Sequence, residues 1–287
     1  MLSPRHEVSD GEKLHVITTS KPSTGSSRFK HHFGAQIDTR RADIILIICF
    51  FISGLTDAAA YNAWNIFLSM QTGNTVFASL GFSNLPEGTT RTQLLKSLCA
   101  ILCFILGALF FSSLHRIFTP QKRWVLILSF SIQVTLIVTS ALLVQSGSVD
   151  DDSPKRPVHA PLNYATRGIK DSPWDLLPIG LLSFQAAGQV VASRALEYAQ
   201  LPTIVISTLY NDLVSDPSFF SGGLLGNAPR NRRVGGIVFY IMGAVSGGVF
   251  AASRYGSAGS LWVVALVKGG IVFGWIGWRE KSEEKGG

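Results

Sequence analysis

Long runs of apolar residues constrain the fold of this chain more than any other feature. Six of these runs approach or exceed the ~20 residues that a helix needs to cross a ~30 Å hydrocarbon core. They lie at 42–61, 94–114, 124–144, 173–198, 234–252 and 261–278. Only 15% of the 287 residues are charged, whereas an ordinary soluble domain has about 25%. The sequence therefore predicts an all-α, polytopic membrane helix bundle, and it lacks the alternating pattern of a transmembrane barrel.

Polar segments divide the chain into one membrane domain with solvated ends. Residues 1–41 are rich in Ser, Lys, Arg and His and lack an apolar signal-peptide core, so we expect a disordered cytosolic tail. Residues 42–279 form the single membrane domain, and 280–287 form a charged tail. A polar loop at 147–172, which contains three consecutive aspartates, separates the domain into two parts. These halves are 42–146 and 173–279.

Two further apolar segments are expected to be short or broken. The first, at 64–82, is interrupted by Gln71-Thr-Gly-Asn-Thr75, which indicates either a broken helix or a re-entrant pair of half-helices. The second, at 201–213, is too short to cross the membrane upright. We therefore expect six full spans and two shorter segments.

The two halves share sequence matches in the same order, which indicates an internal repeat. The matched pairs are Phe50-Xaa-Xaa-Xaa-Gly54 with Phe184-Xaa-Xaa-Xaa-Gly188, Phe104-Ile-Leu-Gly-Ala108 with Tyr240-Ile-Met-Gly-Ala244, and Trp124-Val125 with Trp262-Val263. Their offsets are 134, 136 and 138 residues, so only small insertions are needed. Three spans in each half would insert the second half upside down, as in the inverted repeats of secondary transporters.

The distribution of basic residues favours this six-span topology. Lys and Arg gather in the N-terminal tail, the turn 115–123, the loop 217–233 and the C-terminal tail, whereas four aspartates balance the four basic residues of the loop 147–172. With six spans the basic segments all face the cytosol, as the positive-inside rule requires, and both termini are cytosolic. Eight spans would place the turn 115–123 outside. The protein is expected in the plasma membrane or an internal membrane.

The candidate site is a polar stretch from Gly54 to Thr75 within the apolar region. A carboxylate such as that of Asp57 costs ~3 kcal/mol at the bilayer centre on insertion scales. Because charged residues inside membrane spans usually serve a function, Asp57 is a candidate functional residue. It could carry a proton or cation or oppose a solute charge, or it could only pair with another helix. Arg194 is the favoured partner, although an i,i+3 pair with Glu197 is the alternative.

The second part of the candidate site is Thr72-Gly73-Asn74-Thr75. Glycine would let the backbone leave the helix, so that freed amides or carbonyls bind an ion or carboxylate. The alternative is a tight helix crossing in which Asn74 bonds to a neighbour. Gln189, one turn from Gln185, could line the same cavity or bridge two helices.

Gly54-Leu-Thr-Asp57-Ala58, followed by Thr72-Gly73-Asn74-Thr75, resembles the signature of the YoaK-like family of membrane proteins. The resemblance covers about residues 42–279. Proteins of this family have no established activity. The resemblance therefore implies a membrane fold and a site at these motifs, but no substrate.

Other motifs point away from catalysis and toward helix packing. No nucleophile elbow, zinc-protease motif or phosphate-binding loop occurs, so no enzyme activity and no cofactor or metal is expected. Topology explains the net charge of +7, so no nucleic-acid partner is expected. Gly243-Xaa-Xaa-Xaa-Gly247 and Gly270-Xaa-Xaa-Xaa-Gly274 are close-packing motifs, which could join the last two spans or form a homodimer.

Two functions remain compatible with these features. The first is a small secondary transporter or permease for a small solute or ion, with its site around Asp57 and Thr72–Asn74. The alternative is a non-transporting scaffold or accessory protein in the lipid bilayer, whose polar residues only lock helix packing.

Overall fold

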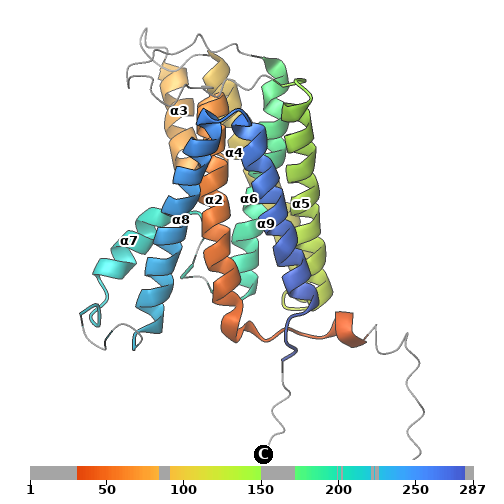
Figure 1. The fold of residues 1–287 in the computed structure, drawn as a ribbon, viewed down its shortest axis with the longest axis vertical. Helices are drawn as coiled ribbons and strands as arrows, with labels where there is room; N and C mark the ends of the chain where they lie inside the picture. Colours follow the sequence, from red (N-terminus) through yellow and green to blue (C-terminus); the bar gives the residue numbers. More distant parts are fainter. Residues whose placement is uncertain are drawn as a thin grey trace, which may run out of the picture.

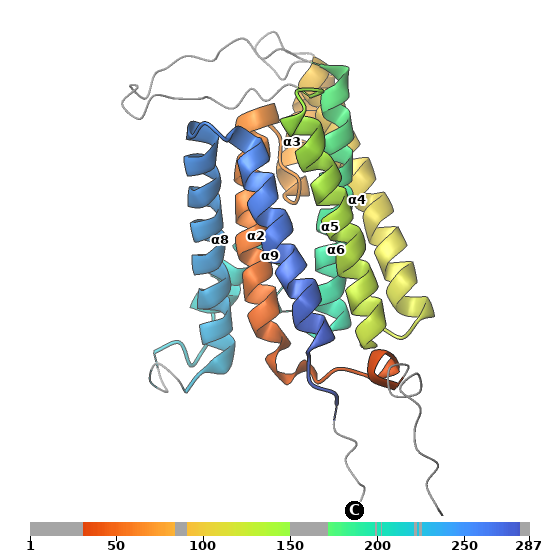
Figure 2. The ribbon, with the colours of Figure 1, turned by 45° about the vertical axis from the view of Figure 1, so that its right-hand side comes forward.

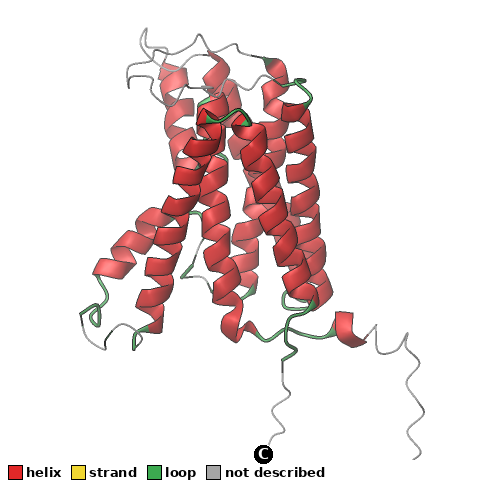
Figure 3. Cartoon of the chain, viewed as in Figure 1, coloured by secondary structure: helices red, strands yellow, loops and turns green. Residues whose placement is uncertain are grey.

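The fold is an upright bundle of helices (Figure 3). A computed structural model describes residues 31–83, 91–149, 172–198, 200–201, 203–220, 223 and 226–281. Six of its helices are long and apolar enough to cross a membrane. They are α2 (Ala42–Trp64), α4 (Arg91–Ile117), α5 (Arg123–Gln145), α6 (Leu176–Ala195), α8 (Ala228–Ala252) and α9 (Gly256–Ile276). The predicted all-α bundle with six spans is confirmed.

Two helices, α2 and α6, occupy the interior of the bundle. More of their residues are buried than in the other four spans. Helix α2 packs along α8 and also contacts α9, whereas α6 packs along α4 and also contacts α5. Helices α5 and α9 lie side by side and close the bundle (Figures 1 and 2). Each central helix is therefore flanked by spans from the other half of the chain.

Two short helices lie at opposite ends of the bundle (Figure 1). Helix α3 (Gln71–Ser83) packs against α4 near the upper end, and α7 (Ile206–Val214) packs against α8 near the lower end. The position predicted for the first break is wrong, because Gln71-Thr-Gly-Asn-Thr75 begins α3 rather than interrupting a helix. The chain leaves helical geometry earlier, at Asn65, whose left-handed backbone (φ 54°) caps α2.

The lower end of the bundle brings together three segments that are distant in sequence. The Ile37 N–H donates to the Gln121 carbonyl (3.1 Å), and the Asp38 N–H donates to the Arg279 carbonyl (2.9 Å). Buried Arg123 donates to the carbonyls of His32 and Trp278. Residues 31–41, assigned to the tail from the sequence, are thus anchored to the bundle. The rest of the predicted tail, residues 1–30, lies outside the described residues.

The other solvated segments lie largely outside the structural description. Residues 150–171 of the predicted loop 147–172 and residues 282–287 of the charged tail are not among the described residues. The ends of the described chain and the turn between α4 and α5 share one end of the bundle, while α5 ends and α6 begins at the other (Figure 2). This arrangement is the one expected for six spans.

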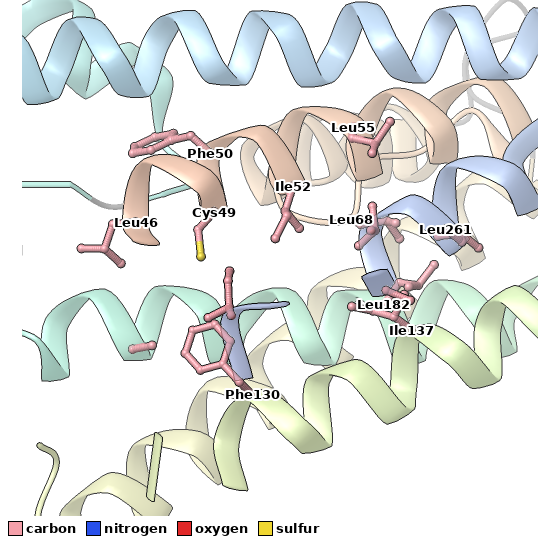
Figure 4. Packing of buried hydrophobic residues seen from close by; sticks show 14 of the residues in the cluster. Leu46, Cys49, Phe50, Ile52, Leu55, Leu68, Phe130, Ile137, Leu182 and Leu261 are labelled. Atoms are coloured by element: carbon pink, nitrogen blue, oxygen red, sulfur yellow. The ribbon is translucent and has the colours of Figure 1, made fainter. Parts of the chain in front are cut away.

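Apolar side chains from both halves fill the interior. Figure 4 shows Leu46, Phe50 and Leu55 of α2 on one side, and Phe130, Ile137, Leu182 and Leu261 of α5, α6 and α9 on the other. Leu68, from the linker between α2 and α3, joins the same cluster. The linker is therefore part of the packed core and not a surface loop.

Glycines permit the closest helix crossings. A Cβ at Gly54 would overlap the Tyr240 carbonyl oxygen of α8, and a Cβ at Gly243 would overlap the Phe51 carbonyl oxygen of α2. Gly107 of α4 makes the equivalent approach to the Phe184 carbonyl of α6. The prediction that Gly243 helps join the last two spans is wrong, because its face packs against α2 instead.

Candidate functional site

The linker at 65–70, between α2 and α3, is organised by the Asp57 carboxylate. Oδ1 of Asp57 accepts hydrogen bonds from the backbone N–H groups of Leu68 (2.9 Å) and Ser69 (2.8 Å). Oδ2 accepts from the Ser69 hydroxyl (2.5 Å) and, more distantly, from the Tyr240 hydroxyl (3.5 Å). Asp57 is 2% exposed. A buried carboxylate that accepts several hydrogen bonds is compensated without a cation, and here it replaces the helical partners that the linker amides lack.

Asn74 holds the linker from the other side. Its Oδ1 accepts from the Phe67 N–H (3.2 Å), while its Nδ2 donates to the Phe67 carbonyl (2.7 Å) and to Gln71 Oε1 (2.9 Å). Asn74 is fully buried. An ionised carboxylate or an aliphatic side chain could not satisfy both groups of Phe67, because the first only accepts and the second does neither.

Gly73 provides space for the aromatic ring beside Asn74. A Cβ at this position would lie 2.8 Å from Cδ2 of Phe67. The Phe67 ring is also stacked with those of Tyr61 and Phe77, with centroid separations of 5.3 and 6.2 Å. Gly73 lies in the first turn of α3, so the expectation that it releases the backbone from the helix is wrong. Its role is close approach.

The two threonines of the second motif point away from this cluster. Thr72 and Thr75 are both exposed, and the Thr75 hydroxyl donates to the Gln71 carbonyl of its own helix (2.8 Å). The structure thus brings Asp57, Gly73 and Asn74 together around the linker, but not Thr72 or Thr75. Solute binding by any of these residues stays a prediction.

The predicted partnership between Asp57 and Arg194 is wrong. Arg194 is exposed in the last turn of α6, near the lower end of the bundle, whereas Asp57 is bonded to the linker and Tyr240. Glu197 does not pair with Arg194 either, because its carboxylate accepts from Gln121 Nε2 (2.9 Å). The repeat correspondence placed Arg194 one turn from Asp57 without accounting for the opposite course of the two helices.

A small cavity with a mostly apolar lining and a few polar groups lies next to the linker, between the two central helices. Its volume is about 10 Å³, close to the space that one water molecule needs. The lining residues are Ile52, Ser53, Thr56, Leu68, Ser69, Gln185, Ala186 and Gln189. Gln189 crosses from α6 to α2, where its Nε2 donates to the Cys49 carbonyl (3.0 Å) and the Ser53 hydroxyl (2.8 Å). Gln189 therefore bridges the two helices as predicted, and the cavity that it lines includes neither Asp57 nor Asn74 among its lining residues.

Three buried charges near or above this cavity were missed by the sequence reasoning. Lys268, in the middle of α9, is completely buried, and its Nζ donates to Gln185 Oε1 (2.6 Å). Lys96 of α4 and Asp175, which precedes α6, form an ion pair of 2.8 Å with both side chains 2% exposed. Lys268 was detectable, because a lysine within an apolar run of this length marks a functional site by default.

The structure offers little that could hold a metal ion. Within the described ranges, no group of three His, Cys, Asp or Glu side chains is arranged to bind one. The polar groups that face the cavity are hydroxyls and amides, which suit hydrogen bonding to a small solute or ion.

Six apolar helices around a shared core define a multi-pass integral membrane protein. The chain belongs to the DUF1275 family, described as "Protein of unknown function", whose model matches residues 45–274. No curated protein and no solved structure matches the chain. The family match therefore supports the membrane domain as one unit and gives no activity.

Proposed function

We propose that this protein is a small secondary transporter or permease for a small solute. The observation that carries the proposal is the small cavity between α2 and α6, the central helices of the two halves, to which both helices contribute polar side chains. A solute there would contact Ser53 of α2 and Gln189 of α6, which hydrogen-bond to each other. Polar groups at this depth are costly in hydrocarbon and are typical of substrate or ion pathways.

An inverted repeat of the two halves supports this function. Under the sequence matches, α2 corresponds to α6, α3 to α7, α4 to α8 and α5 to α9. The packing of α2 on α8 then corresponds to that of α6 on α4, and the packing of α3 on α4 to that of α7 on α8. The two short helices lie at opposite ends, as an inverted repeat requires (Figure 1). Such a repeat permits alternating access to a site between the halves.

The proposed orientation places both termini in the cytosol. It rests on the basic residues of the chain ends and of the turn 115–123, whereas four aspartates balance the basic residues of the loop 147–172. Single cysteines at Ser148 and Ser282 test it with a membrane-impermeant thiol reagent. The proposal predicts labelling from opposite sides of the membrane, and labelling of both from the same side would contradict it.

A scaffold or accessory protein is the second candidate, and one observation favours it. The hydrogen bonds of Asp57 and Asn74 run to the linker, to α3 and to Tyr240, so these residues are occupied in fixing the fold. In that case the cavity is only a packing defect that holds a water molecule. The two candidates differ in whether the cavity opens to either side of the membrane.

Three narrower expectations also remain proposals. The YoaK-like identity is compatible with the matched family. The homodimer would use the face of α9 at Gly270 and Gly274, where an added Cβ would meet nothing within 4 Å. A non-enzymatic protein without nucleic-acid partners is expected from the sequence motifs and the position of the basic residues.

Solute uptake into sealed vesicles tests the transport proposal. The purified protein is reconstituted, and uptake of a panel of small organic and inorganic solutes is compared with that of protein-free vesicles. Uptake of one solute should fall roughly tenfold or more in Gln189→Leu, since one lost hydrogen bond of ~1.4 kcal/mol corresponds to that factor. The control is Thr135→Ala on α5, whose exposed hydroxyl donates only to the Ser131 carbonyl of its own helix. Folded protein that transports none of the panel would favour the scaffold.

A further inference from the structure

Lys268 is a buried cation without an acidic partner in the part of the chain that the structure describes. Its side chain is completely inside the protein, and α9 places it midway along a membrane span. A charge in that position is costly unless an opposite charge or several hydrogen bonds compensate it. Its Nζ donates a hydrogen bond to a neutral amide, Gln185 Oε1, at 2.6 Å. An ammonium group has three N–H donors, so this bond leaves capacity for another acceptor.

The carboxylates in or next to the described spans form hydrogen bonds or ion pairs with residues other than Lys268. Asp57 accepts from Leu68, Ser69 and Tyr240. Asp175 pairs with Lys96, and Asp43 pairs with Arg232 at 2.7 Å. The positive charge of Lys268 is therefore not neutralised by a carboxylate of the described chain.

Gln185 connects Lys268 to the cavity, because it bonds to the ammonium group and also lines the cavity. Lys268 can only donate, so the Gln185 amide must present its oxygen to Lys268 and its NH₂ group away from it. Gln185 lines the cavity, so that NH₂ group is a donor available there. Across the cavity, the Ser53 hydroxyl accepts from Gln189 Nε2 and keeps its own hydrogen for a second partner. Two donors backed by a buried cation form a site suited to an anion.

We propose that the cavity binds a small monovalent anion, with Gln185 and Ser53 as hydrogen-bond donors and Lys268 as the counter-charge. The inference rests on the proposed transport function, because it names the class of solute. A volume near that of one water favours an ion of one heavy atom, such as a halide, in this closed state, and formate would require the walls to move apart. A bound anion would compensate the positive charge of Lys268.

Thermal unfolding of the purified full-length protein tests the anion site. Sodium chloride or sodium formate replaces sodium gluconate at constant ionic strength. The midpoint temperature of the wild-type protein should rise saturably with at least one of the two small anions, because a ligand that binds the folded state stabilises it. The anion that gives the rise distinguishes a halide from a small carboxylate. A midpoint equal to that in gluconate at every concentration would overturn the proposal without any variant.

Variants connect the response to Lys268. Lys268→Met should lose the saturable rise and should be at least as stable as wild type in gluconate, because it removes an uncompensated buried charge. Lys268→Arg should retain a rise with a shifted half-saturating concentration. Ser260→Ala, a buried position on the same helix, is the matched control and should respond like wild type. A full wild-type response in Lys268→Met would overturn the anion site.

Flux measurements separate this inference from the function on which it rests. Saturable anion binding with no uptake of that anion into vesicles would retain the site and contradict transport. Uptake of a neutral or cationic solute that is unchanged in Lys268→Met would retain transport and contradict the anion site.

Discussion

Lys96 and Asp175 form an ion pair of 2.8 Å that is almost completely buried between α4 and the start of α6. A second pair, Arg232 with Asp43, joins α8 to the start of α2 at 2.7 Å. Lys96 and Arg232 are separated by the same offset of 136 residues as the repeat match between Phe104 and Tyr240. Under the proposed inverted repeat, the two ion pairs would join corresponding helix pairs at opposite ends of the bundle.

The two pairs should differ in their contribution to stability. Lys96→Met leaves Asp175 buried without its partner, which we expect to cost about 3–5 kcal/mol. Arg232→Met should cost at most about 1 kcal/mol, because both side chains of that pair are partly exposed. Unfolding in detergent measures both changes. The double variant Lys96→Met with Asp175→Leu should recover most of the loss, and a double variant as unstable as Lys96→Met would contradict a pairwise cause.

The stability of the folded protein should depend on how many hydrogen bonds the side chain at position 57 can accept. Asp57→Ala leaves the buried N–H groups of Leu68 and Ser69 without an acceptor, and each such group costs about 1–3 kcal/mol. Asp57→Asn keeps one carbonyl oxygen and should lose less. Asn62→Ala is the control on the same helix, because its side chain bonds only to the Ala58 carbonyl. Equal unfolding midpoints for Asp57→Ala and wild type would contradict this role.

The close crossings should not tolerate even one added methyl group. Gly54→Ala places a Cβ against the Tyr240 carbonyl and should destabilise the protein by about 1–3 kcal/mol, the usual cost of overpacking. Gly248→Ala on α8 is the matched control, since an added Cβ meets nothing within 4 Å. It should be neutral or stabilising by up to about 1 kcal/mol through helix propensity. Similar unfolding midpoints for the two variants would contradict the packing described for α2 and α8.

Asp216, outside the spans, should give a pH-dependent contribution to stability. The Ser218 N–H holds the pKa of this carboxyl below its usual value, and Asn227 and Arg233 act in the same direction. A folded-state pKa below the unfolded value of about 3.9 means that the contribution is complete above that pH and is lost as the pH falls through the folded pKa. Wild type should therefore exceed Asp216→Asn in unfolding temperature near neutral pH. The difference should shrink below about pH 4, and a constant difference in strong acid would contradict the assignment.

The fold was predictable because membrane spans depend on length and apolarity, which the sequence displays directly. The site was less predictable because its geometry depends on contacts across the bundle. Asp57 and Asn74 were identifiable as costly polar residues, but the sequence could not show that both bond to the linker at 65–70. Arg194 was misassigned because a sequence repeat gives correspondence and not proximity. Lys268 was missed although its position in an apolar run was visible.

Access to the cavity from both sides of the membrane is the most direct test of the proposed transport function. Ser53→Cys is introduced into a variant with Cys49, Cys99 and Cys103 replaced, and an impermeant thiol reagent is applied to either side of sealed vesicles. Exposed controls are Ser146→Cys at one end of the bundle and Arg194→Cys at the other. A transporter predicts that the Ser53→Cys thiol reacts from both sides, whereas each control reacts from one. No reaction of the Ser53→Cys thiol from either side, with both controls reactive, would contradict alternating access and leave the scaffold.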